Sequence, residues 1–236
     1  MTKLFFKSCK YFTQHTGRLI EIVFKTNTSI DLVIVNNYSP HSSRSIEERY
    51  KHFKKLREIT TDNEGRIVMV MGDFNSRFHH RTEGESHTLG PHIYGKGKEV
   101  MEQIIERDIE GTQNRSLTLE WAMENDLVCM NTFFQKTLNK LITFREKTTD
   151  LETRNWENRD EYAQIDFLWA QQRWKNSIVN IETDPASNFP SDHFPLTATI
   201  RLRLEERDDL EEGLKVKWKR VQKPYHVQKL VEKISA

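Results

Sequence analysis

Short runs of apolar and β-branched residues, separated by polar segments, recur along the chain and predict mainly strands. The runs at 17–25 and 30–38 are joined by a short polar segment, so we expect an antiparallel hairpin. Residues 66–71 form a nearly continuous apolar run, which is typical of a strand buried on both faces, and Gly72 is expected to end it. Further strands are expected at 127–134, 141–145, 164–170, 177–183 and 195–203.

Apolar residues spaced three to four positions apart predict helices between these strands. The segment 44–60 has the pattern of an amphipathic surface helix, with apolar positions at Ile46, Tyr50, Phe53 and Leu56. Further helices are expected near 97–107 and over the apolar positions from Leu117 to Met123. The rest of 76–114 is rich in His, Gly, Glu and Lys, so we expect an exposed excursion there. Many strands and few helices favour a sandwich.

The length of 236 residues suits one sizeable domain, which we place at 15–203. The last part, 204–236, holds an acidic block followed by a basic one, as solvated tails or linkers usually do. The chain has 36 Lys and Arg against 35 Asp and Glu, so any surface that attracts nucleic acid must be local.

Cysteine content and hydropathy indicate in which cellular compartment the protein is expected. Cys9 and Cys129 lie far apart and have no zinc-ligand spacing, which argues for a reducing compartment and against a structural metal cluster. No apolar run is long enough for a signal core or a membrane span. We therefore expect a soluble intracellular protein, nuclear or cytoplasmic, without a membrane partner.

Polar residues that can carry chemistry stand next to the expected strands. Asp73 and Asn75 follow the buried strand, where the turn at Gly72 would project an acid and an amide from the sheet edge. Asp192 and His193 stand just before the last strand, where they can offer a carboxylate to a cation and an imidazole to a phosphoryl oxygen. A strand-ending turn is an equally open interpretation of the first motif, and a lone His beside an Asp is more often only a surface pair.

Two further positions point to the same edge. Asp166 is an acid inside an otherwise apolar strand, and a buried carboxylate needs a partner, for which His193 is the obvious candidate. Tyr38 ends the second hairpin strand and begins a Tyr-Ser-Pro loop, although simple packing before a proline turn explains it as well. All four motifs adjoin strands of one inferred sandwich, so their side chains are expected to converge.

Tyr-x-Pro, Gly-Asp-x-Asn, Gln-Ile-Asp and Ser-Asp-His-x-Pro, in this order, resemble the motif set of the endonuclease/exonuclease/phosphatase (DNase I-like) superfamily. The stretches around Gly90-Pro91-His92, Asn131-Thr132-Phe133-Phe134 and Arg173-Trp174 are similar to the endonuclease domains of non-LTR retrotransposons. The resemblance covers about residues 15–203. It implies a four-layered α/β sandwich, in which two packed mixed sheets are flanked by helices.

The resemblance also implies a role for each matching residue. Asp73 matches the acid that orients the attacking water, and Asn75 its partner at the phosphate. His193 matches the imidazole that contacts the scissile phosphate, and Asp166 the acid that orients this imidazole. Asp192 resembles a metal-binding carboxylate and Tyr38 a phosphate contact, with Mg²⁺, or Mn²⁺ in its place, as the cofactor and DNA as the partner.

The chain departs from the family pattern at its beginning. Family domains open with a strand bearing Asn and continue to a strand ending in a metal-binding Glu, and neither is found here. Residues 1–16 are too short for them, and Glu21 sits inside the first hairpin. We therefore expect a truncated domain that binds Mg²⁺ weakly, has low or no activity and needs another chain or segment to complete its sheet. Two loops also depart from the pattern: 92–114 is longer and more charged than the usual connector, and 145–161 inserts acidic and basic residues. In the family such loops often contact DNA, so the resemblance leaves the substrate preference open.

Three functions remain open at this point. The first is hydrolysis of DNA phosphodiester bonds by a metal-assisted water. The second is a non-catalytic remnant of a retrotransposon, either a nucleic-acid-binding module or an unselected fragment. The third is a phosphatase of the same superfamily that acts on small phosphates, which shares Gly-Asp-x-Asn and Ser-Asp-His. The resemblance of Asn131-Thr132-Phe133-Phe134 to retrotransposon endonucleases favours the first function over the third.

Overall fold

The computed structural model describes residues 7–147, 155–187 and 190–203. The chain divides into two compact units, Met1–Glu206 and Arg207–Ala236. All described residues belong to the first unit. The expected tail at 204–236 and part of the loop at 145–161 lie outside the described residues.

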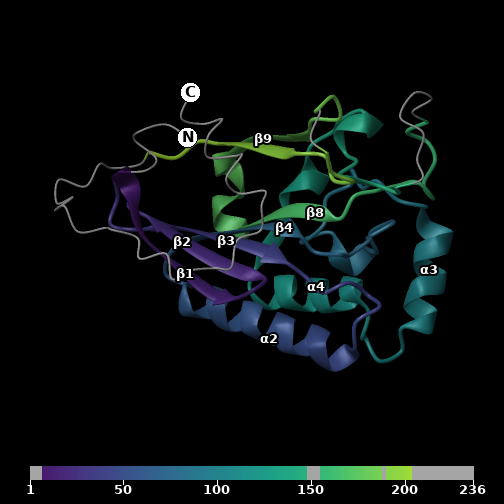
Figure 1. The fold of residues 1–236 in the computed structure, drawn as a ribbon, viewed down its shortest axis with the longest axis horizontal. Coiled ribbons are helices and arrows are strands. Elements are labelled where there is room, and N and C mark those ends of the chain that lie inside the picture. Colours follow the sequence, from purple (N-terminus) through teal and green to yellow (C-terminus); the bar gives the residue numbers. More distant parts are fainter. Residues whose placement is uncertain (1–6, 148–154, 188–189, 204–236) are drawn as a thin grey trace. The chain divides into compact units, whose positions relative to one another are not determined.

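A six-stranded mixed sheet forms the middle layer of this unit (Figure 1). The order is β1-β2-β3-β4-β8-β5, and neighbours are antiparallel except for the parallel pair β3 and β4. The strands are β1 (Cys9–Thr16), β2 (Leu19–Phe24), β3 (Leu32–Tyr38), β4 (Ile67–Asp73), β5 (Leu127–Cys129) and β8 (Asp166–Gln171).

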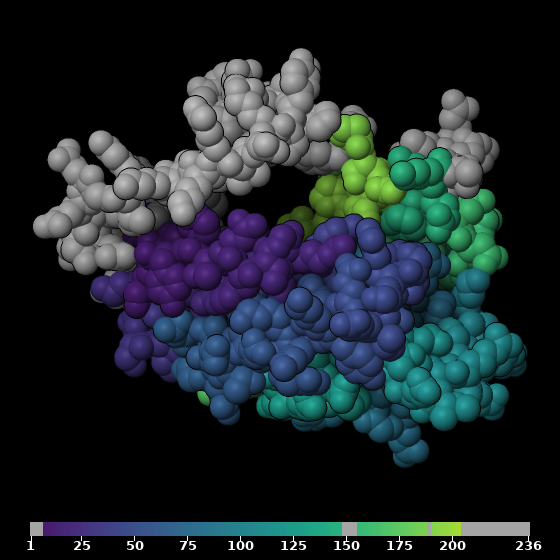
Figure 2. Space-filling view, turned by 60° about the horizontal axis from the view of Figure 1, so that its bottom comes forward, coloured from purple at the N-terminus to yellow at the C-terminus, as the bar shows by residue number. Residues whose placement is uncertain are grey.

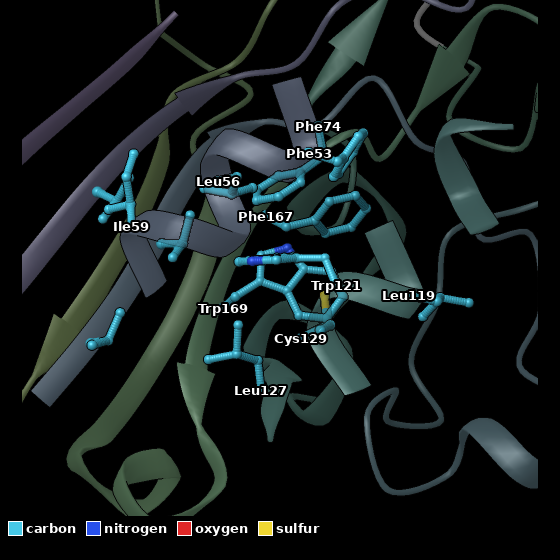
Figure 3. Packing of buried hydrophobic residues seen from close by; sticks show 14 of the residues in the cluster. Phe53, Leu56, Ile59, Phe74, Leu119, Trp121, Leu127, Cys129, Phe167 and Trp169 are labelled. Carbon is cyan, nitrogen blue, oxygen red and sulfur yellow. The ribbon is translucent and has the colours of Figure 1, made fainter. Parts of the chain in front are cut away.

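Helices α2 (Ile46–Asp62) and α4 (Asn114–Glu124) cover one face of this sheet, the face seen in Figure 2. Every second residue of β2 and β3 points toward them, and Val23, Val33 and Val35 are fully buried there. Aromatic side chains fill the centre of this layer, as Figure 3 shows. Trp121 of α4 packs with its ring centroid 5.7 Å from that of Trp169 on β8.

A smaller antiparallel sheet lies on the other face of the large sheet. It consists of β9 (Ile178–Thr183) and β10 (Leu196–Ile200), whose alternate side chains join the second apolar cluster with Met69 and Leu168. A short hairpin-like pair, β6 (Phe144–Arg145) and β7 (Tyr162–Ala163), forms a third sheet. Helix α3 (Lys98–Arg107) stands in the long excursion after β4.

The predicted α/β sandwich and its element order are confirmed. The hairpin at 17–38, the helices and the strands at 164–170, 177–183 and 195–203 are found with their ends shifted by a few residues. Three predictions need correction. The strand at 127–134 turns into a 3₁₀ turn (Met130–Phe133) after Cys129, the strand at 141–145 shrinks to β6, and Gly72 lies within β4 rather than at its end. Strands β1 and β7 were not expected.

The two sheets differ in how completely they are paired. Within the described residues, β10 hydrogen-bonds to β9 alone, so its other edge has no strand neighbour there. Its apolar side chains at Leu196, Ala198 and Ile200 are only half-buried. Among the described helices, none has the length and apolar character needed to cross a bilayer.

Candidate active site

The close approach of β3 to β4 places the first acid. Gly72 has φ +131°, and a Cβ atom on it would lie 2.0 Å from the carbonyl oxygen of Asn37, so only glycine fits. The parallel register then sets Tyr38 beside Asp73. The backbone carbonyl of Asp73 accepts hydrogen bonds from the Ser39 amide (2.8 Å) and the Asn37 side chain (3.1 Å).

Asp73 and Asn75 form one hydrogen-bonded turn. The Asn75 amide donates to Oδ1 of Asp73 (2.7 Å), and the Asn75 side chain donates to Oδ2 (3.1 Å). Asn75 also donates to the carbonyl of Ser39 (2.8 Å) and takes a left-handed backbone with φ 48°. Asparagine tolerates this conformation better than most residues, so the turn fixes the carboxylate and the amide together.

Asp166 starts β8 directly opposite Asp73, because the two residues are register partners on antiparallel strands. Its position is fixed by two buried side chains. Thr143 Oγ1 accepts from the amides of Ile165 and Asp166, each at 3.0 Å. Asn131 donates to the Asp166 carbonyl (3.1 Å) and accepts from the Leu168 amide (2.9 Å).

His193, in the segment before β10, contacts Asp166 at the start of β8. The Nδ1 atom of His193 lies 2.9 Å from Oδ2 of Asp166. A β-bridge between His193 and Phe144, whose rings are 5.2 Å apart, and the bond from the Arg145 amide to the Asp192 carbonyl (2.9 Å) fix this segment. With Nδ1 engaged, Nε2 is the ring nitrogen left for another partner.

Burial and like charges shape the electrostatics of these groups. Burial, together with the neighbouring Asp166 carboxylate, raises the pKa of Asp73 to about 6, against the hydrogen bond from the Asn75 amide. The hydrogen bond to Asp166 raises the pKa of His193 and so favours the imidazolium. The site therefore holds a carboxylate that titrates near neutrality beside an imidazole inclined to carry a proton.

These side chains border an open cleft of about 540 Å³. Tyr38, Asp73, Asn75, Asp192 and His193 line it, whereas Asp166 lies behind His193. The Tyr38 side chain is exposed, and the Arg18 guanidinium lies 4.9 Å from its ring centre. All six residues singled out in the sequence are thus brought together, while Glu21 is buried against His15 (2.7 Å) and does not line the cleft.

The oxygen donors of the cleft fit a hydrated Mg²⁺ and do not fit a cation held by protein alone. Among the described residues, no three His, Cys, Asp or Glu side chains are grouped to hold a metal ion. Mg²⁺ usually keeps several waters and uses one or two carboxylates together with substrate phosphates. Asp192, half-buried at the cleft, and Asp73 are carboxylates of this kind.

Several residues of the site had no signal in the sequence. Asn131 belongs to a stretch singled out for its resemblance, but its bonds to β8 follow only from the 3₁₀ turn after β5. Thr143, Arg77 and Glu146 stand in no recognisable pattern. Gly90 packs against Thr132, where a Cβ atom would lie 2.2 Å from the carbonyl oxygen, so two of the stretches that resemble retrotransposon endonucleases contact each other.

Comparison of sequences gives a limited match. No family model matches the chain. The chain is 26% identical over 193 residues to craniofacial development protein 2 of Bos taurus and 25% identical over 193 residues to that of Tragulus javanicus. These matches cover 80% of this chain but 27% and 28% of the relatives, so the chain spans about a quarter of their length.

Comparison of structures shows the fold. The catalytic domain of Xenopus laevis APE2 has a TM-score of 0.59 at 15% identity, covering 81% of this chain and 58% of that chain. The 3' phosphatase NExo of Neisseria, bound to a product DNA hairpin, has 0.54 at 12% identity, with 82% and 71% covered. The AP endonuclease LMAP of Leishmania major has 0.54 at 15% identity, with 80% and 56% covered. The chain therefore has the mixed α/β sandwich of the DNase I-like fold.

Proposed function

We propose that this chain hydrolyses phosphodiester bonds of DNA by in-line attack of water, as a metal-dependent endonuclease. The observation that carries the proposal is the convergence of four separate segments on one cleft, with Asp166 bonded to His193 at 2.9 Å behind Asp73, Asn75 and Asp192. An acid whose pKa is raised to about 6, beside an imidazole whose pKa is raised by its hydrogen bond to Asp166, suits general acid–base chemistry at a phosphate.

In this mechanism Asp73 accepts a hydrogen bond from the attacking water and orients it. Asn75, whose side-chain amide donates to Asp73 and to the Ser39 carbonyl in the free protein, exchanges one of these bonds for a phosphate oxygen. His193 donates from Nε2 to a phosphoryl oxygen, on which negative charge grows in the transition state. Asp166 keeps the imidazole in the orientation that presents Nε2, and Tyr38 contacts the phosphate.

Asp192, with Asp73 nearby, would hold Mg²⁺ or Mn²⁺. When bound, the cation would neutralise charge on the phosphate oxygens and lower the pKa of bound water. Asp192 is the one direct carboxylate ligand that the resemblance assigns within the described residues, so we propose that the metal is bound weakly and that the isolated chain is a slow enzyme.

We further propose that another chain or segment completes the small sheet and brings a second carboxylate. The unpaired edge of β10 within the described residues supports this proposal. For a retrotransposon-type origin, the support is the sequence resemblance of the stretches around Gly90, Asn131 and Arg173. DNA as the substrate is supported by the names of the similar structures, one of which was solved with a product DNA hairpin.

Nicking of supercoiled plasmid in Mg²⁺ tests the activity. We expect slow nicking by the unaltered chain and a loss of about 100-fold or more in Asp73→Ala and His193→Ala, because each removes a group that acts on the phosphate. Asp62→Ala and His87→Ala, at exposed positions outside the cleft, serve as matched controls and should nick like the parent. Nicking that survives both active-site substitutions would contradict the proposal.

The same preparations separate the rival functions. A chain that binds DNA but gives no nicking in Mg²⁺ or Mn²⁺ would be a binding module. Release of inorganic phosphate from a 3'-phosphorylated oligonucleotide, or from small phosphate esters, without any nicking would indicate a phosphatase. Either result contradicts the endonuclease assignment.

A further inference from the structure

Arg77 stands in the cleft on a loop whose neighbouring residues are firmly held. Ser76, which is 1% exposed, contacts the Asn114 carbonyl (3.0 Å) and Thr118 Oγ1 (2.7 Å) through its hydroxyl. These bonds tie the residue before Arg77 to helix α4. The backbone that carries Arg77 is therefore fixed on its amino-terminal side.

On the carboxyl-terminal side of Arg77, the backbone is fixed by His79. Its backbone is left-handed (φ 56°), and a Cβ atom on Gly95 would lie 2.2 Å from the His79 Cα, so the two chain segments are in direct contact. The Lys96 amide also lies within hydrogen-bond range of His79 Nδ1 (3.3 Å). The backbone on both sides of Arg77 is therefore fixed, which limits the positions that its side chain can reach.

The guanidinium of Arg77 itself is weakly engaged. It lies 3.5 Å from a carboxylate oxygen of Glu146, and the side chains are 36% and 47% exposed. Within the described residues Arg77 makes no hydrogen bond. Exposed ion pairs of this length contribute little free energy, so a stronger anion can displace Glu146.

Three cations lie near His79, and Arg77 has the weakest contact among them. Burial, and then the cations Arg77, Lys96 and Arg115, lower the pKa of His79 to about 4. Arg115 is paired with Glu85 (2.7 Å) and Lys96 with Asp160, whereas Arg77 lies 3.5 Å from Glu146. Arg77 lines the same cleft as Asp73 and Asp192, so its guanidinium is available to a ligand that these residues bind.

We infer that Arg77 forms a second phosphate-binding site in this cleft, which binds the phosphodiester next to the scissile one and which Glu146 occupies in the absence of nucleic acid. The inference rests on the proposed function. The planar guanidinium can bind two phosphate oxygens at once, a geometry that the ammonium of lysine cannot reproduce. This site would hold the neighbouring part of the strand in register while Asp73 and His193 act on the target phosphate.

Binding of a short DNA duplex with hydroxyl ends, measured by fluorescence anisotropy in EDTA over a series of KCl concentrations, tests the inference without catalysis. Loss of one phosphate contact lowers the slope of log affinity against log salt by about 0.9 for duplex DNA. We expect Arg77→Gln to show this change and to bind about fivefold more weakly at low salt, because a charge-assisted hydrogen bond is lost.

Glu146→Gln is expected to bind severalfold more tightly, because it frees Arg77 and removes a charge that repels phosphate. The exposed pair of Arg57 and Glu124 supplies matched controls, with side chains 36% and 46% exposed and neither residue at the cleft. Arg57→Gln and Glu124→Gln should leave both the slope and the affinity unchanged.

The outcomes separate the inference from the function on which it rests. If the unaltered chain binds DNA and Arg77→Gln shows the same salt slope, the second site is refuted while the nuclease proposal stands. If the slope changes only on a duplex with terminal phosphates, Arg77 binds a strand end and the internal site is refuted. If the unaltered chain does not bind DNA at all, the proposed function itself fails.

Discussion

Two carboxylates, those of Asp73 and Asp166, face each other on neighbouring strands of one sheet. Burial penalises the charged form of Asp73, and the like charge of Asp166 directly opposite adds to this cost. The pKa of Asp73, raised to about 6 from its usual 3.8, records this cost. The folded state therefore binds a proton more tightly than the unfolded state, so the free energy of unfolding decreases as the pH rises from about 4 to 6.

Replacement of Asp73 by Asn should stabilise the metal-free protein at pH 8. The variant removes a buried charge, and after the lost hydrogen bonds from Asn75 are deducted we expect a gain of about 1–2 kcal/mol in the free energy of unfolding. At pH 4 the carboxyl of the parent is largely protonated, so the gain should vanish. Urea unfolding in EDTA at both pH values measures the difference.

Asp62→Asn, an exposed acid at the end of α2, is the control and should change little at either pH. A variant Asp73→Asn that is no more stable than the parent at pH 8 would show that the charge of Asp73 is compensated in the folded state. That result would also remove the physical basis for a water-orienting acid that titrates near neutrality.

Individual site residues were predictable where a motif adjoined a strand. Asp73, Asn75, Asp166, Asp192 and His193 each stand at a strand end or in an apolar run, and the structure brings them together. The roles assigned to them stay predictions. Arg77 and Glu146 were not predictable, because their proximity depends on the path of two long loops that carry no periodic pattern.

Among the elements, β8 depends most on side chains from outside the sheet. Thr143, which is fully buried just before β6, accepts hydrogen bonds from two backbone amides at the start of β8. Asn131, after β5, bonds to the backbone on both sides of Phe167. These contacts satisfy backbone groups that have no strand partner and place Asp166 in line with His193.

Thr143→Val should preserve the shape of the side chain but leave the amides of Ile165 and Asp166 without an acceptor. Unsatisfied buried donors cost about 1–3 kcal/mol each, so we expect a loss of roughly 2 kcal/mol in the free energy of unfolding. Thr197→Val, at an exposed position of β10, is the matched control. Chemical denaturation of both variants checks the prediction, and equal stability would contradict it.

The strands and helices were predictable where the spacing of apolar residues and the length of the run indicate the same type of element. The apolar runs of β2, β3, β4 and β8 and the apolar stripe of α2 are long enough to be unambiguous. β1 was missed because its sequence, CKYFTQHT, has few apolar residues and lies half-exposed at the sheet edge. The strand at 127–134 was overextended because the run LVCMNTFF has the composition of a strand throughout, although Met130–Phe133 form a 3₁₀ turn.

At the scale of the whole described unit, the two sheets are unequal. Six strands, backed by two helices, face a sheet of two strands, and the described residues leave apolar side chains such as Ile20 exposed and Ile34 half-buried. Exposed apolar area and an unpaired strand edge favour association with another polypeptide. This inequality is the structural basis for the proposed partner of β10.

Hydrogen exchange should therefore differ sharply between the sheets. We expect the amides of β10 that point away from β9 to exchange at least about 100-fold faster than those of β4 and β8, since exchange at edges requires only local opening. Mass spectrometry on peptic fragments, or nuclear magnetic resonance, measures this ratio. Equal protection in β10 and β8 would mean that the edge of β10 is already covered.

The register of β4 against β8 has a consequence for how such proteins can diverge. A single inserted or deleted residue within either strand would shift the pairing by one position and turn part of that strand to the opposite face. Asp73 and Asp166 would then no longer lie opposite each other. Connecting loops, including the one that carries Arg77, tolerate changes in length far better. Proteins with this register can therefore differ in the loops around the cleft while the two acids stay opposite each other.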